Sequence, residues 1–233
     1  MNTDIEQLGI DVIQRLLDKS NGKRIYIDIK HMSRKTRIAY YKILETEYNT
    51  EKIPIIVSHG AVNGYPKLDD FDCPQRDRNG KFLGRDINFY DDEIVKIAVS
   101  GGIFGLQIDE RLITNRCELR KIKYLCRTPG MKLKRRTRLV WNQIQYIADL
   151  LDSKGLDAWG ITAIGTDFDG MSDPINEYWT SSELQYLHKN LLVYANEYLD
   201  QKIFNVSSSK IPSNIIMAKI FSENALNFLS KYY

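Results

Sequence analysis

Short apolar runs that alternate with segments of helical periodicity are the feature that most constrains the fold of this 233-residue chain. The runs cover residues 24–29, 54–58, 103–108 and 158–166. Strands that alternate with helices in this way form parallel βαβ units with right-handed crossovers. The pattern therefore predicts an α/β fold whose parallel sheet has about four strands.

Helices are expected before, between and after these runs, because apolar residues recur there every three or four positions. The expected helices cover residues 4–19, 33–46, 90–100, 141–151, 181–198 and 213–231. A complete (β/α)₈ barrel needs about 250 residues and eight strands. In this chain, four strands with their helices and two long loops account for the whole length. We therefore expect a single domain over residues 1–233 that corresponds to half of a TIM-type barrel.

Composition excludes several other classes of protein. The chain is 43% hydrophobic with a net charge of +3, which is too apolar and too weakly charged for a disordered protein. It contains no apolar run of about 18 residues that could span a membrane, and charges within residues 1–20 interrupt any secretory signal. The three cysteines are widely spaced, which favours reduced thiols over a disulfide framework. We expect a cytoplasmic protein.

Three of the four apolar runs end at a side chain that could ligate a metal or catalyse a reaction, namely His31, His59 and Asp167. The carboxyl ends of parallel strands face one edge, where substrates bind. Imidazole suits zinc, and a carboxylate can ligate the ion or accept a proton. The alternative is that each histidine only hydrogen-bonds a loop. His188 falls within an expected helix, and we predict that it is a surface residue.

A basic insertion is expected as a loop over residues 109–138. Its part at residues 116–138 holds ten Lys and Arg residues against a single acid, Glu118. Such a run could bind the phosphates of nucleic acid. We favour a solvated loop because no nucleic-acid-binding fold accompanies it, and we expect neither a nucleic-acid nor a membrane partner.

Several strings resemble the renal-type (membrane) dipeptidases, zinc peptidases among the amidohydrolase-like metal-dependent hydrolases. Residues 28–33 read Asp-x-x-His-x-Ser, residues 58–59 read Ser-His, and residues 165–170 read Gly-Thr-Asp-Phe-Asp-Gly. These match the family's barrel strands five, six and eight in the right order. Residues 84–87 resemble its Arg-Asn-Val stretch, and residues 221–229 resemble its closing helix. The resemblance covers nearly the whole chain but only the C-terminal half of the family's barrel.

The resemblance implies a hydrolase that cleaves the peptide bond of dipeptides at a two-zinc centre. By this resemblance, His31 and His59 would ligate the second metal ion. Asp167 would be the catalytic carboxylate that accepts a proton from the bridging hydroxide. Arg85 would bind the terminal carboxylate of the substrate, a role that suits guanidinium geometry. The alternative for Arg85 is a solvated loop side chain.

The sequence also departs from the family. The family's first strand carries a His-x-Asp pair and its third strand a bridging glutamate, whereas this chain has three histidines and no His-x-Asp pair. It therefore offers two nitrogen ligands and one carboxylate, and the second metal site is incomplete. One explanation is a fragment or split half that needs an N-terminal half chain or a homodimer. The alternative is a catalytically inactive half-barrel that serves as a binding or assembly module.

Overall fold

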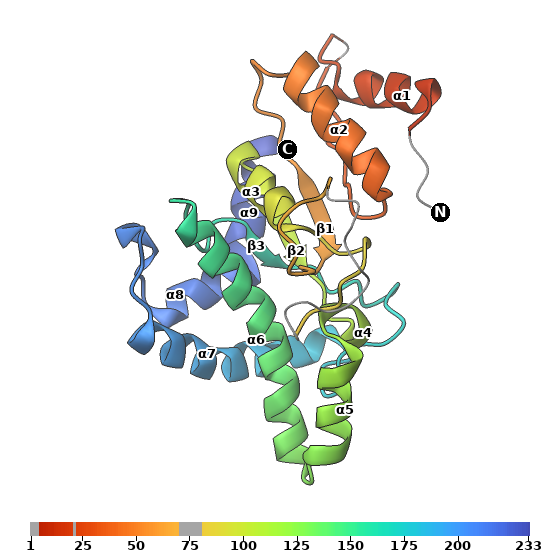
Figure 1. Ribbon diagram of the computed structural model, residues 1–233. Helices are drawn as coiled ribbons and strands as arrows, with labels where there is room; N and C mark the ends of the chain where they lie inside the picture. Colours follow the sequence, from red (N-terminus) through yellow and green to blue (C-terminus); the bar gives the residue numbers. More distant parts are fainter. Residues whose placement is uncertain (1–4, 21, 70–80) are drawn as a thin grey trace.

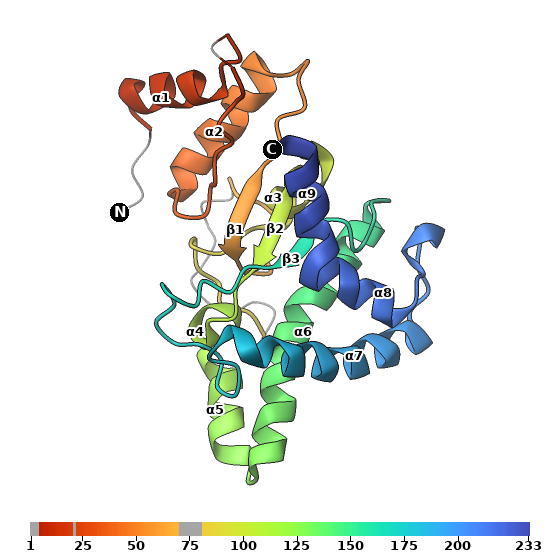
Figure 2. The ribbon, with the colours of Figure 1, turned by 180° about the vertical axis from the view of Figure 1, so that it is seen from behind.

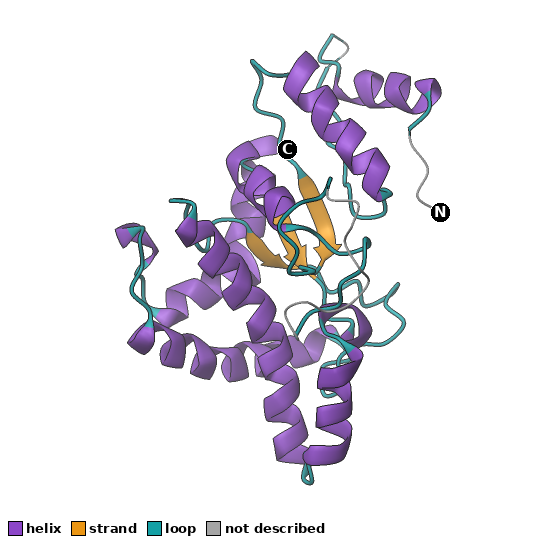
Figure 3. Ribbon diagram, in the orientation of Figure 1, coloured by secondary structure: helices purple, strands orange, loops and turns teal. Residues whose placement is uncertain are grey.

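The structure, a computed structural model, describes residues 5–20, 22–69 and 81–233. An open parallel sheet lies among helices (Figures 1 and 3). Its strands pair in chain order and are β1 (Ile56–Gly60), β2 (Ile103–Leu106) and β3 (Thr162–Ile164). The predicted α/β class with a parallel sheet is confirmed.

The first apolar run contributes less sheet than the sequence predicts. Asp28 forms an isolated parallel bridge with Ile56 of β1, and the Ile29 N–H donates to the Ile56 carbonyl at 3.0 Å. Ile25, at the start of the run, is 62% exposed. The run thus adds one parallel bridge beside β1 and not a full strand, because at its start the Ile25 N–H donates to the Leu16 carbonyl of α1 at 2.9 Å.

Helices occupy every segment in which the sequence predicts one. α3 and α9 contact the sheet, α6 packs on α3, and the π-helical turn η3 joins α8 to α9. The helices are α1 (Gln7–Leu17), α2 (Arg34–Glu47), α3 (Asp91–Ser100), α4 (Glu110–Ile113), α5 (Arg116–Leu125), α6 (Pro129–Ser153), α7 (Leu184–Gln201), α8 (Ser213–Ala218) and α9 (Asn224–Tyr232), with shorter turns at Ser181–Glu183, Ser207–Ser209 and Lys219–Glu223.

The insertion at residues 109–138 was predicted to be a loop, and this prediction is wrong, because α4, α5 and the first turns of α6 fill it. The side chain of Asn115 caps α5, and Thr128, followed by Pro129, caps α6. Long Lys and Arg side chains have high helix propensity. Glu118 then bridges the two helices, since it binds both Lys121 of α5 and Arg135 of α6.

The direction of the strands decides where a site can form. In both Figure 1 and Figure 2 the strand arrows point from the α1–α2 end of the molecule toward α4. A cluster of buried apolar side chains, which extends from Ile13 of α1 to Ile220 of η3, supports the sheet. Within the described ranges, no helix is both long enough and apolar enough to cross a membrane.

Candidate functional site

His31 and His59 meet at the carboxyl end of the sheet. His31 follows the first apolar run and is exposed, whereas His59 lies in β1 and is half-buried. Their Nε2 atoms are 3.1 Å apart, and the ring centroids are separated by 5.0 Å. Two unprotonated ring nitrogens repel each other at this distance. A proton or a cation between them is therefore needed to hold the pair together.

Asp28 and Ser58 fix the orientation and the tautomer of His59. The Ser58 hydroxyl donates to Asp28 Oδ2 at 2.5 Å, and the Ser58 N–H donates to Asp28 Oδ1 at 3.1 Å. Since this hydroxyl has given its only proton to Asp28, it accepts from His59 Nδ1–H at 2.8 Å. His59 Nε2 is then unprotonated and faces His31, which is the state required of a metal ligand.

His59 remains neutral because of its surroundings. Burial lowers the pKa of His59 below its usual 6.5. The charge of Asp167 opposes this shift, whereas the nearby Lys30 and His31 reinforce it. The net lowering of the pKa favours the unprotonated ring near pH 7.

Asp167 approaches the pair from the loop after β3, with Oδ2 3.6 Å from His59 Nε2. Its backbone is left-handed, with φ of 56°, which is a strained conformation for a residue with a side chain. Gly170 closes the turn with its N–H on the Asp167 carbonyl. A Cβ at Gly170 would lie only 2.7 Å from Asp167 Oδ1. The glycine thus leaves room for the carboxylate beside His59.

Two glycines, Gly105 in β2 and Gly165 directly after β3, bring the backbone close beneath this cluster. A Cβ at either Gly105 or Gly165 would lie 2.0 Å from the Ser58 carbonyl oxygen. Neither position could carry a side chain without moving β1. These glycines therefore set the position of Ser58, and with it that of His59.

Lys30 is a member of the cluster that the sequence analysis missed. It is only 2% exposed. Burial, followed by the nearby charge of Arg37, lowers the pKa of Lys30 to about 8. The carboxylates whose charges oppose this shift are Asp28, Asp167 and Asp109. An amine therefore lies within electrostatic reach of three acids at the same edge of the sheet.

Gln107 and Asp109 also lie beyond a strand end and are both 3% exposed. The Gln107 N–H donates to the Gly60 carbonyl at 2.9 Å, which places the residue beside β1. The Asp109 carboxylate binds the side chain of Arg111 at 3.1 Å. The signal that identified His31 and His59, a polar residue directly after an apolar run, would also have found Asp109 and Lys30, whereas Gln107 lies within the run at residues 103–108.

The structure does not join Arg85 to the cluster. Arg85 lies in an exposed loop, and its N–H donates to the Leu83 carbonyl. Within the described ranges, no hydrogen bond or ion pair connects its side chain with His31, His59 or Asp167. Binding of a substrate carboxylate by Arg85 stays a prediction.

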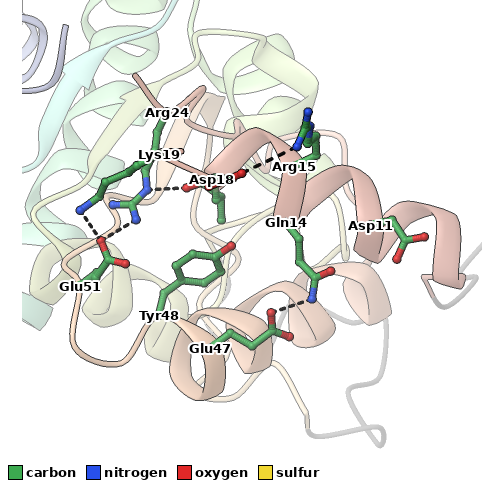
Figure 4. A pocket seen from close by; sticks show the side chains of 10 residues that line it. Asp11, Gln14, Arg15, Asp18, Lys19, Arg24, Glu47, Tyr48 and Glu51 are labelled. Atoms are coloured by element: carbon green, nitrogen blue, oxygen red, sulfur yellow. Dashed lines mark hydrogen bonds and ion pairs between the residues drawn. The ribbon is translucent and has the colours of Figure 1, made fainter. Parts of the chain in front are cut away.

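His188, for which the sequence predicts a surface position outside the site, is half-buried on α7, where its ring packs edge-on against Phe221. A hollow of about 580 Å³ lies between α1 and α2 (Figure 4). Its charged side chains pair with one another, as Glu51 does with Lys19 and Arg24. We assign no function to this hollow.

The donor atoms fit a metal ion in part. Tetrahedral zinc with bonds of about 2.0–2.1 Å separates two ligand atoms by about 3.3 Å. The His31–His59 and His59–Asp167 distances of 3.1 and 3.6 Å bracket this value. In the described part of the chain, however, no group of three or more His, Cys, Asp and Glu side chains is arranged to hold an ion. The chain thus offers a pair of imidazoles with one carboxylate close by.

No protein-family model matches the sequence, and no curated protein matches it. The class of the molecule therefore rests on its own fold and site. It is an α/β protein whose parallel sheet carries imidazole, amine and carboxylate groups at its carboxyl end.

Proposed function

We propose that this chain forms half of a zinc-dependent hydrolase that cleaves the peptide bond of dipeptide-like substrates. The observation that carries the proposal is that His59 Nε2 lies 3.1 Å from His31 Nε2 and 3.6 Å from Asp167 Oδ2, although the three residues come from separate segments of the chain. The chain-order parallel sheet supports a TIM-type half-barrel. Its strand segments would correspond to barrel strands five to eight.

Each member of the cluster has a role in this proposal. His31 and His59 would hold the ion, and the Asp28–Ser58 pair keeps His59 in the tautomer that leaves Nε2 free to do so. When bound, the ion would polarise the peptide carbonyl and make the attacking water more acidic. The Asp167 carboxylate accepts the proton of that water and delivers it to the leaving amine nitrogen.

The proposed site needs ligands from outside these 233 residues, because two imidazoles and one carboxylate do not complete a binuclear centre. Either a chain that supplies the N-terminal strands or a second copy of this chain would bring them. The edge of the sheet at residues 24–29, where Ile25 is exposed, offers a place for added strands. Arg85 is proposed to bind the carboxylate of the substrate.

Metal binding by the purified chain tests the ligands separately from catalysis. We expect Co²⁺ to bind with an imidazole signature in its absorption spectrum and to be displaced by Zn²⁺. His31→Ala and His59→Ala should each weaken binding by more than about tenfold. His188→Ala is the matched control, because this histidine lies on α7 against Phe221, and it should leave binding unchanged.

Hydrolysis tests the role of Asp167 once the missing strands are supplied. Asp167→Asn should retain metal binding but lower the rate of dipeptide hydrolysis by about 10²–10⁴-fold, the usual contribution of a general base. Hydrolysis that resists chelators or survives His59→Ala would rule the mechanism out. A chain that binds no metal, alone or with added strands, would favour the inactive binding or assembly module.

A further inference from the structure

The helical hairpin formed by residues 116–138, here called the basic hairpin, carries exposed apolar side chains at its tip. Tyr124 and Leu125 end α5, and Met131 lies in the first turn of α6. They are 69%, 66% and 48% exposed. In Figures 1 and 2 the hairpin extends beyond the sheet and the other helices. A projecting element with an apolar tip is the form expected of a contact surface.

Cations surround this apolar tip. Lys123 precedes it, Arg127 lies in the turn between the helices, and Lys132 follows Met131. None of the three cations forms an ion pair with a described residue, whereas Lys121 and Arg135 nearby neutralise Glu118. The tip therefore presents apolar side chains within a ring of uncompensated positive charge.

The positive charge continues along α5. Arg116 and Arg120 precede Lys123 at spacings of four and three residues, so the three share one face of the helix. Arg116 and Arg120 are exposed and also lack an ion-pair partner among the described residues. Any partner of this hairpin must therefore accept apolar side chains at the tip and carry negative charge beside it.

We propose that the basic hairpin binds the surface of an anionic lipid bilayer. Leu125 and Met131 would enter the boundary between headgroups and acyl chains, where Tyr124 matches the amphipathic interface. Lys123, Arg127 and Lys132 would meet the anionic headgroups, whose attraction falls off within about 10 Å. The sequence alone indicates no membrane partner, but this contact needs no membrane span, since it is peripheral and uses only a helix turn. It does not depend on the proposed hydrolase function.

Charge and apolar character together favour a bilayer over nucleic acid. Nucleic-acid phosphates would pair with the cations but would leave Leu125 and Met131 in water, because phosphate contacts are made by charged and polar groups. Binding of single strands requires aromatic residues on which several bases stack, and the tip offers Tyr124 alone. A bilayer satisfies both kinds of group at once.

Vesicle co-sedimentation of the full chain tests the proposal. We expect binding to vesicles of phosphatidylcholine mixed with phosphatidylglycerol, weaker binding in high salt, and little binding to phosphatidylcholine alone. Leu125→Asp with Met131→Asp should reduce the partition coefficient by more than about tenfold, because two apolar side chains leave the bilayer. Lys123→Glu with Lys132→Glu should cause a loss of similar size in low salt but a smaller one in high salt.

Two control variants match these changes away from the hairpin. Leu226→Asp alters a leucine on α9 that is 61% exposed, and Lys189→Glu alters an exposed lysine on α7. Both should bind vesicles as the parent chain does. Circular dichroism melting of all variants checks the fold, and we expect no change because Lys123, Leu125 and Met131 are exposed and Lys132 is only half-buried.

Three outcomes would overturn the proposal. The first is equal binding by the tip variants and the parent chain. The second is salt-sensitive binding to a DNA or RNA duplex without vesicle binding, which would assign the basic hairpin to nucleic acid. The third is a parent chain that self-associates and does not bind vesicles, while the Leu125→Asp variant is monomeric in sedimentation. That result would make the tip a contact between copies of the chain.

Discussion

At the scale of single residues, the cluster is held together by groups that do not themselves face a ligand. The hydrogen bond from Ser58 to Asp28 makes the Ser58 hydroxyl an acceptor, and this acceptor fixes the proton of His59 on Nδ1. Gly105 and Gly165 exclude side chains from the space beside the Ser58 carbonyl. The edge of the sheet that carries the cluster therefore depends on small and polar residues beneath it.

Replacement of Ser58 by alanine tests this dependence. The Ser58→Ala variant loses the acceptor for His59 Nδ1–H, so both tautomers of the ring become available. We expect Zn²⁺ affinity to fall by about 10–100-fold, the usual effect of losing a group that orients a metal ligand. The matched control is Ser153→Ala, whose hydroxyl donates only to the Leu150 carbonyl at the end of α6. ¹⁵N chemical shifts of the imidazole nitrogens report the tautomer, and unchanged shifts in Ser58→Ala would contradict the argument.

At the scale of elements, a buried ion pair and its hydrogen bonds hold two helices together. Arg37 of α2 and Glu93 of α3 are both fully buried, and they pair at 2.7 Å. Tyr41 donates to the same carboxylate at 2.7 Å, as does the Tyr90 N–H at 3.1 Å. These contacts fix α2, which follows His31, against α3, which precedes β2.

We predict that Glu93→Gln strongly destabilises the protein. The substitution leaves the Arg37 guanidinium buried without a counter-charge, and breaking a buried pair in this way costs about 3–5 kcal/mol in the free energy of unfolding. Glu45→Gln is the control, because Glu45 pairs with Lys96 between the same two helices in an exposed position. It should change the free energy of unfolding by less than about 1 kcal/mol. Urea unfolding measures both, and equal effects would contradict the role assigned to burial.

A second connection, between α6 and the segment before α8, predicts a dependence on pH. Burial raises the pKa of Asp152, but donation from the Val206 and Asn205 N–H groups and the charge of Lys202 outweigh this effect and hold the pKa below its usual 3.8. A carboxyl whose pKa is lower in the folded state contributes stability above pH 3.8, and this stability is lost as the pH falls through the folded-state pKa.

Asp152→Asn should accordingly lower the free energy of unfolding at pH 7 by about 1–3 kcal/mol, because a neutral amide accepts the two N–H groups less well. The difference from the parent chain should shrink as the pH falls below 3.8. Asp200→Asn on the exposed side of α7 should have no effect at either pH. Urea unfolding across this pH range provides the measurement, and a deficit that persists in acid would refute the explanation.

The elements also show what the sequence could and could not predict. Helical periodicity located α1, α2, α3, α7 and α9, because their apolar faces pack on the core. It failed at α5, because this helix is rich in charged residues and has few buried positions, such as Ile122, from which an apolar periodicity could be recognised. The polar residues at the ends of the apolar runs correctly indicated that His31, His59 and Asp167 lie close together. The Asp28–Ser58 connection was not predictable, since it depends on the register between the first run and β1.

At the scale of the whole molecule, the sheet is open at the edge formed by residues 24–29. Of this run, Asp28 alone bridges to β1, and the N–H groups of Tyr26 and Ile27 have no backbone partner among the described residues. The basic hairpin lies beyond the other end of the strands in Figures 1 and 2. The proposed strand-completing surface and the proposed lipid surface are therefore separate, and both can be occupied at once.

Hydrogen exchange tests whether this edge is available to a partner. We expect the amides of Tyr26, Ile27 and Asp28 to exchange rapidly, whereas those of β2 are protected, because the Phe104 N–H donates to the Ile161 carbonyl at 2.8 Å and strands lie on both sides. A polypeptide that completes the proposed barrel must pair with residues 24–29 and should slow their exchange while β2 changes little. Rapid exchange that persists in a catalytically active complex would show that the added ligands reach the site by another route, and protection in the isolated chain would show that the edge is already covered.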